Sequence, residues 1–146
     1  MQTQELKKAF GDRLKEHEPL GRYTTFKIGG PADLFIDAKT RDEFVTAVSL
    51  ARSAGLPIFI LGGGTNILIG DRGIRAFVIK NSTQGITIRG VKGSVEQGNA
   101  KRTVFVEADS GVPMNKLVRF TIEEGLSGLE MQLGLPGSVG GAVFMN

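Results

Sequence analysis

Apolar residues that recur every third or fourth position indicate three helices. In the first, Leu6, Phe10 and Leu14 share one face. In the second, Thr40 and Glu43 have the spacing of an N-terminal capping box. The third begins at Pro113 and is expected to turn four side chains inward, namely Leu117, Val118, Thr121 and Ile122. These helices are predicted over residues 2–16, 40–54 and 113–124.

Short apolar runs bounded by glycine and proline predict strands. Gly29-Gly30-Pro31 is expected to join the first two in a hairpin, and a strand, helix, strand unit follows up to residue 80. After residue 81 the runs alternate, with turns expected at Gly90, Gly93 and Gly98-Asn99, so we predict an antiparallel meander. The strands are predicted over residues 23–28, 34–38, 57–61, 67–69, 76–79, 86–88, 95–96 and 104–107.

A first glycine-rich segment, Leu61 to Asn66, directly follows a predicted buried strand and reads LGGGTN. Glycines there let backbone N–H groups approach a phosphate, and the carboxyl edge of such a sheet is a common ligand site. A strand, not a helix, is expected after it, and no G-K-[ST] follows, so neither the Rossmann nor the Walker A motif fits. The alternative is a tight turn that needs glycine for its conformation alone.

A second glycine-rich segment covers Gly134 to Ala142 and reads GLPGSVGGA. Gly137 and Ser138 could offer N–H groups and a hydroxyl to a ligand, and Gly140-Gly141 could pass close to a flat ring. The alternative is a packed bend. Asp109-Ser110-Gly111, between a strand and a helix, could bind an anion, although Ser110 as a helix cap is the favoured interpretation. Glu130 is expected to be exposed or locally paired, and Met114, Met131 and Met145 to fill the core.

Composition narrows the function classes. The chain has 146 residues, 21 glycines, no cysteine, one histidine and a net charge of +3. A thiolate metal site and a cysteine nucleophile are therefore excluded, and His17 lies in a polar stretch that is unsuited to a buried catalytic base. Basic residues are scattered and aromatic residues are few, which disfavours nucleic-acid binding. No apolar stretch is long enough to span a membrane, so a cytoplasmic protein is expected.

Three segments together resemble UDP-N-acetylenolpyruvoylglucosamine reductases, also called UDP-N-acetylmuramate dehydrogenases or the MurB family. These are YTTFKIGGPA at 23–32, LGGGTNIL at 61–68, and GLSGLE at 125–130 followed by LPGSVGGAVFMN at 135–146. Their order and spacing match that family, within the wider vanillyl-alcohol-oxidase superfamily of flavoproteins. The resemblance covers residues 18–146.

The resemblance implies an α+β fold: a two-lobed, PCMH-type FAD-binding domain in which the first lobe is a small strand-helix-strand unit and the second an incomplete antiparallel sheet with helices. The expected organisation is an N-terminal helix over residues 1–19, lobe 1 over 20–80 and lobe 2 over 81–146. FAD would be non-covalent, with NADPH as the reductant of the complete enzyme. The implied cofactor-binding residues are Leu61, Gly62, Gly63, Gly64, Thr65, Asn66, Ile67, Gly111, Leu135, Pro136, Gly137, Ser138, Gly140, Gly141 and Ala142.

Family members continue past Met145-Asn146, and their later residues supply the proton donor, the enolate-stabilising arginine and most of the UDP-sugar site. We therefore expect a truncated chain that holds no catalytic residue, no metal and no substrate-binding domain, and that is inactive alone. Open sheet edges would favour self-association. The alternatives are a non-catalytic flavin-binding module that needs a partner chain, and the FAD domain of another flavoenzyme in the superfamily, against which the 24–32 segment argues.

Overall fold

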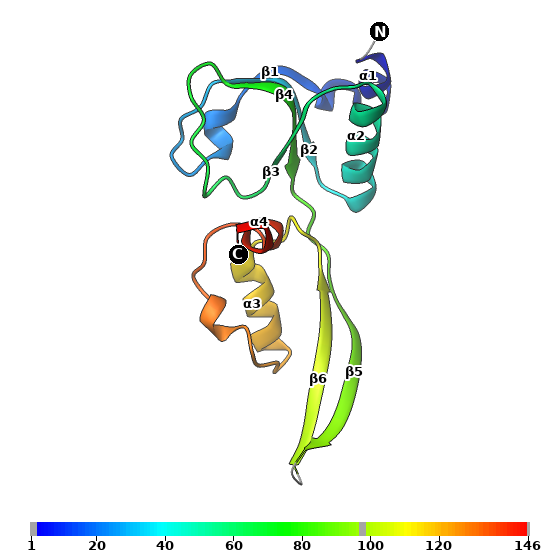
Figure 1. Ribbon diagram of the computed structural model, residues 1–146, viewed down its shortest axis with the longest axis vertical. Coiled ribbons are helices and arrows are strands. Elements are labelled where there is room, and N and C mark those ends of the chain that lie inside the picture. Colours follow the sequence, from blue (N-terminus) through cyan, green and yellow to red (C-terminus); the bar gives the residue numbers. More distant parts are fainter. Residues whose placement is uncertain (1–2, 97–98, 146) are drawn as a thin grey trace.

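A four-stranded sheet is built from the first half of the chain, in the order β1-β2-β4-β3 (Figure 1). Three strands, β2, β3 and β4, run parallel, and β1 pairs antiparallel with β2. The carboxyl ends of the three parallel strands therefore meet at one edge of the sheet. The strands are β1 (Lys15–Pro19), β2 (Pro31–Ala38), β3 (Ile58–Leu61) and β4 (Ile74–Asn81). This computed structural model describes residues 3–96 and 99–145.

Both faces of this sheet are covered, because its strands alternate apolar side chains above and below the sheet. On one face, Ile36 and Phe77 pack with Leu6 of α1 (Gln4–Phe10) and Ala47 of α2 (Arg41–Ser53). The opposite face packs Phe35 and Val78 with Leu20 of the turn after β1, Leu61 of β3 and Ile69 of the loop before β4. This second cluster includes Leu61, the last residue of β3, so it lies beside the carboxyl edge of the sheet.

The predicted capping box of α2 is confirmed. The Glu43 amide donates to the Thr40 hydroxyl over 3.2 Å, and the Glu43 carboxylate accepts from the Lys39 amide over 2.8 Å. The same carboxylate also pairs with Arg13. Arg13 and these backbone bonds lower the pKa of Glu43 to about 2, with the Arg13 hydrogen bond as the largest cause.

Three predictions for the first part of the chain are wrong. The N-terminal helix ends at Phe10 and does not reach residue 16 or fill residues 1–19, because Gly11 turns with φ of +53° and a 3-10 turn, η1 (Gly11–Arg13), leads into β1. Residues 23–28 hold no strand; the 3-10 turn η2 (Leu20–Tyr23) and a loop occupy this region, so no hairpin forms around Gly29. Residues 67–69 form no strand and lie in the loop between β3 and β4, with Leu68 exposed and Ile69 buried.

The second half of the chain holds one long hairpin with two helices beside it (Figure 1). Its strands are β5 (Ile86–Glu96) and β6 (Asn99–Ala108), and its helices are α3 (Met114–Glu123) and α4 (Val139–Met145), with the 3-10 turn η3 (Glu130–Gln132) between them. The three-strand meander is wrong, since Gly90 and Gly93 pair within β5 and Gly90 marks only a register shift. The predicted turn at Gly98-Asn99 falls partly outside the described residues.

The third helix matches its prediction except at one position. Leu117, Val118 and Thr121 are buried, whereas Ile122 is half exposed, and Pro113 precedes the helix as its N-cap. Among the methionines, Met114 is buried as expected. Met131 and Met145 are exposed, so they are not core residues.

A buried polar cluster joins the two halves. The Asn81 side-chain oxygen accepts from the Thr83 amide and hydroxyl, and its nitrogen donates to the Ser110 hydroxyl over 2.7 Å. The Thr83 hydroxyl in turn accepts from the Gly111 amide. A β-carbon on Gly111 would lie 2.5 Å from the Asn81 side-chain oxygen, so this joint itself requires glycine there.

An ion-pair network crosses the same joint at the surface. Arg41, at the start of α2, contacts Glu107 over 2.8 Å and Asp109 over 2.7 Å, and Glu107 also pairs with Arg89. These arginines lower the pKa of Glu107 to about 2, the Arg89 hydrogen bond being the largest cause. The network connects the second helix to the hairpin.

Candidate functional site

The two glycine-rich segments, far apart in sequence, contact each other at the carboxyl edge of the sheet. A β-carbon on Gly62 would lie 2.7 Å from the Ser138 hydroxyl, and one on Gly137 would lie 2.9 Å from the Thr65 hydroxyl. A β-carbon on Gly63 would lie 2.9 Å from the Cα of Gly137. Glycine is therefore needed for the close approach of two backbones, not only for the shape of each turn.

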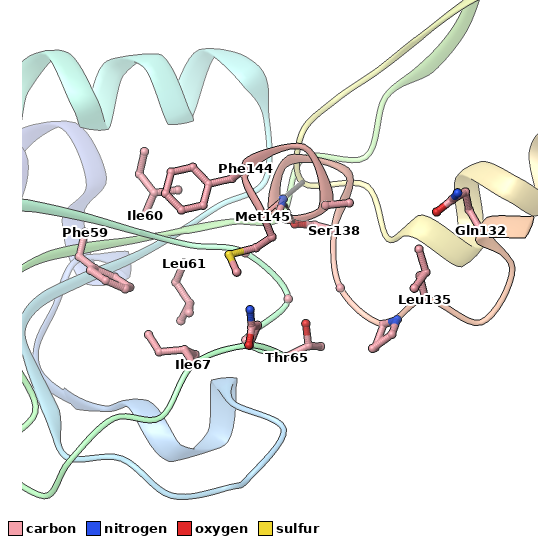
Figure 2. A pocket seen from close by; sticks show the side chains of 18 residues that line it. Phe59, Ile60, Leu61, Thr65, Ile67, Gln132, Leu135, Ser138, Phe144 and Met145 are labelled. Atoms are coloured by element: carbon pink, nitrogen blue, oxygen red, sulfur yellow. Dashed lines mark hydrogen bonds between the residues drawn. The ribbon is translucent and has the colours of Figure 1, made fainter. Parts of the chain in front are cut away.

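A cavity of about 600 Å³ opens where the segments meet (Figure 2). Its polar part is formed by Thr65, Asn66 and Ser138, and Phe59, Ile60, Phe144 and Met145 add an apolar wall. A few polar groups within a mostly apolar concave wall are typical of cofactor pockets. Figure 2 shows Leu135 and Gln132 on the opposite side of the cavity from Phe59.

A second cavity, of about 260 Å³, adjoins the first. Both cavities share Gly62, Gly63, Thr65, Gly137 and Ser138, so the glycine contact forms the boundary between them. The smaller cavity is otherwise lined by the end of β4, the loop after it and the start of the third helix, that is Lys80, Asn81, Ser82, Gln84, Gly111 and Pro113. A long ligand can therefore contact both cavities at once.

Backbone N–H groups of the first segment are open to a ligand. Within residues 3–96 and 99–145, no hydrogen bond engages the amides of Gly63, Gly64, Thr65 or Asn66. Successive amides without partners form a concave site that favours phosphate oxygens. The middle of the segment is fixed from behind, because the Gly64 carbonyl accepts from the Thr25 amide over 3.0 Å.

The second segment uses its amides differently. The Val139 amide donates to the Val112 carbonyl, and the Gly140 amide donates to the Ser110 carbonyl, both over 2.8 Å. The N-terminus of α4 is thus docked on the loop before α3 and does not present these two donors to a ligand. This overturns the interpretation of Ser110 as a helix cap, since its hydroxyl binds Asn81 and its carbonyl holds Gly140.

Comparison with known proteins shows which family has this kind of site. Residues 32–146 match the family described as "FAD binding domain". The chain belongs to the FAD-binding domain family.

Relatives of this FAD-binding domain carry one shared name. The chain is 46% identical to the UDP-N-acetylenolpyruvoylglucosamine reductase of Rubrobacter xylanophilus over 132 residues. This match covers 90% of the chain and 41% of that reductase. The chain is 36% identical to the UDP-N-acetylenolpyruvoylglucosamine reductase of Syntrophus aciditrophicus over 143 residues. This match covers 98% of the chain and 44% of that reductase. The chain spans about 40% of the length of the curated relatives that it matches.

The fold is also that of a solved member. The crystal structure of UDP-N-acetylenolpyruvylglucosamine reductase (MurB) from Thermus caldophilus superposes with a TM-score of 0.61 and 30% identity, over 89% of this chain and 41% of that one. The predicted mixed α+β FAD-binding fold is confirmed by this match.

The residues present fit FAD on three observations. The first segment offers unpartnered amides for a diphosphate, three glycines let the two segments close against each other beside the cavity, and an apolar wall suits a flat ring system. No group of three or more metal-ligating side chains occurs in the described part of the chain, and none of its helices is long and apolar enough to cross a membrane.

The structure brings together almost all of the residues that the sequence singled out for the cofactor. Thirteen line the larger cavity and Gly111 lines the smaller one, while Gly140 lines neither and packs on Ser110. Those in the larger cavity are Leu61, Gly62, Gly63, Gly64, Thr65, Asn66, Ile67, Leu135, Pro136, Gly137, Ser138, Gly141 and Ala142. Their role in binding FAD stays a prediction.

Sequence reasoning missed the residues at the end of β4 and the apolar wall. Lys80, Asn81 and Ser82 lie at the carboxyl end of β4, which is parallel to β3, so the carboxyl-edge rule applied to both strands would have found them. Phe144 and Met145 had no such signal. Glu130 accepts from the Gly128 amide over 2.8 Å, as expected for a locally paired carboxylate.

Proposed function

We propose that this chain is the FAD-binding portion of an NADPH-dependent reductase that acts on UDP-N-acetylglucosamine enolpyruvate and forms UDP-N-acetylmuramate for peptidoglycan synthesis. One observation carries the cofactor part: two glycine-rich segments 70 residues apart close around a cavity with unpartnered amides. The shared name of the relatives supports the reaction, since their names state the substrate and the reduction.

The residues of the first segment, Gly62 to Asn66, would hold the diphosphate through their amides. Ser138 and Gly141 of the second segment, with Leu135 and Phe144, would hold the ribityl chain and ring. FAD held there would supply the hydride chemistry that links NADPH to the enolpyruvyl double bond. The chain's own contribution is to bind, orient and shield the cofactor, because the residues lining the larger cavity carry no charge and no histidine.

We propose non-covalent attachment. Covalent flavin links use histidine or cysteine side chains; the chain has no cysteine, and its one histidine, His17, lies exposed on β1 and lines neither cavity. All bound flavin should therefore leave on denaturation.

We place no catalytic residue of the reduction in these 146 residues. The groups that bind the UDP-sugar and protonate the reduced carbon would come from the parts of such a reductase that this chain does not match, since it covers about 40% of its relatives. A cytoplasmic location and self-association through the open edges of the antiparallel β5–β6 pair complete the proposal.

The test has two steps. The purified chain is titrated with FAD and followed by flavin fluorescence, then passed over a desalting column in denaturant; saturable binding and full release support the cofactor role. FAD-loaded chain is then mixed with NADPH and enolpyruvyl-UDP-N-acetylglucosamine. No product is expected, and measured turnover would contradict the placement of the catalytic residues elsewhere.

A further inference from the structure

One lysine distinguishes the smaller cavity from the larger one. Among the described residues that line the two cavities, Lys80 alone carries a charge. The larger cavity is lined only by apolar and uncharged polar residues. The two cavities therefore offer different chemistry, and a cation is available only in the smaller one.

The fold directs Lys80 to the glycine-rich edge. It is the last but one residue of β4, in register with Leu61 of β3 and with Asp37 of β2. Its ammonium lies 3.4 Å from the Gly62 carbonyl oxygen, and no ion pair to Asp37 occurs within the described residues. The charge is thus held beside the first glycine segment and not neutralised by the neighbouring carboxylate.

The amides of Gly63 and Thr65 belong to residues that line the same cavity and have no partner among the described residues. Amides supply partial charges, whereas an ammonium on a flexible stem supplies a full one and binds phosphate as a point charge. An anion in this cavity would contact both kinds of donor.

We propose that Lys80 binds the diphosphate of FAD in the smaller cavity and sets the preference of this chain for FAD over flavins that lack a diphosphate. The inference rests on the proposed cofactor role. It divides the ligand between the cavities, with the diphosphate at Lys80 and Gly63 and the ring against the apolar wall of Phe59 and Phe144.

A purely structural role for Lys80 makes a different prediction. If Lys80 only tied down the Gly62 carbonyl, its removal would misplace the whole segment and weaken every flavin alike. A diphosphate contact weakens FAD selectively. Riboflavin, which has the same ring and no phosphate, is therefore the discriminating probe.

The experiment measures dissociation constants of FAD and riboflavin by flavin fluorescence for the 146-residue chain, K80M and K80R. We expect K80M to weaken FAD about tenfold or more, as for loss of one charge-assisted contact, with riboflavin changed less than about twofold. K80R keeps the charge and should retain most of the FAD affinity. Added salt should weaken FAD binding by the unmodified chain more than by K80M.

The other possible outcomes contradict either this inference or the proposed function. Equal FAD affinity in K80M and the unmodified chain, equal salt dependence, or the same loss for FAD and riboflavin would overturn the inference while leaving the cofactor role intact. Absence of any FAD binding by the unmodified chain would overturn the proposed function and this inference with it. Thermal unfolding of K80M and K80R confirms that both variants are folded.

Discussion

Gly63 and Gly137 pack backbone against backbone, so closely that a β-carbon on Gly63 would lie 2.9 Å from the Cα of Gly137. The contact joins the loop after β3 to the loop before α4, and both loops line both cavities. The glycine content of each segment is thus explained by the presence of the other. A site assembled in this way is sensitive to a single methyl group.

G63A is predicted to weaken FAD binding about tenfold or more, because the new methyl group must push back rigid backbone and not a flexible side chain. G70A is the matched control, since a β-carbon on Gly70 meets nothing within 4 Å and its φ is not positive. The measurement is an FAD titration of both variants. Equal affinities for G63A and G70A would show that the glycine contact does not shape the site.

G64A is predicted to lower the free energy of unfolding by more than G55A. Both glycines have left-handed backbones, with φ of +65° and +64°, so both alanines cost about 1–2 kcal/mol of backbone strain. Only at Gly64 would the β-carbon also overlap the Tyr23 carbonyl oxygen, whereas Gly55 faces open space. Urea unfolding compares the two, and equal losses would contradict the packing of Tyr23 on this loop.

Sequence reasoning predicted the local features that depend on neighbouring residues. The capping box of Thr40 and Glu43, the strand that ends at Leu61 and the buried face of the third helix each follow from short-range pattern. It failed where a tertiary contact decides the conformation. Residues 67–69 have strand-forming side chains but pair with none of the four strands of the sheet.

The candidate site was predictable as two separate glycine segments, and the family resemblance joined them. Nothing in residue spacing shows that Gly63 touches Gly137, because the contact depends on how two loops dock. The docking uses the Ser110 and Val112 carbonyls, which no side-chain pattern reveals. The position of Lys80 in the smaller cavity was also not predicted from the sequence, because a lysine at the end of a strand usually faces solvent.

N81A is predicted to destabilise the chain by about 2–4 kcal/mol, because the buried amide and hydroxyl of Thr83 and the hydroxyl of Ser110 would lose their partner. N115A is the control: the exposed Asn115 accepts from the Gly134 amide, a bond that water can replace, and we expect a loss under about 1 kcal/mol. Urea unfolding gives both values. Similar losses in the two variants would show that the Asn81 cluster between the two halves does not add to stability.

Acid should destabilise the chain through Glu43. Its pKa is lowered to about 2 in the folded state by Arg13 and the Lys39 amide, so the unfolded chain binds more protons between about pH 4.5 and 2. The stabilisation is complete above that range and is lost as the pH falls through it. E43Q should remove about 1–3 kcal/mol of this pH dependence.

Unfolding measured at several pH values checks this prediction. E5Q, which neutralises an exposed glutamate of α1, serves as the control and should leave this part of the profile in place. An E43Q profile that parallels that of the unmodified chain down to pH 2 would show that the Arg13 pair contributes nothing to stability.

Hydrogen–deuterium exchange with and without FAD tests the central claim most directly, that one cofactor is held between the two glycine segments. The account predicts that FAD slows exchange in peptides covering residues 62–66 and, in the same titration, in peptides covering 135–142. The distal part of the β5–β6 hairpin, around residues 91–93, should be unaffected. Protection of only one segment, or of neither at saturating FAD, would contradict a site formed by both.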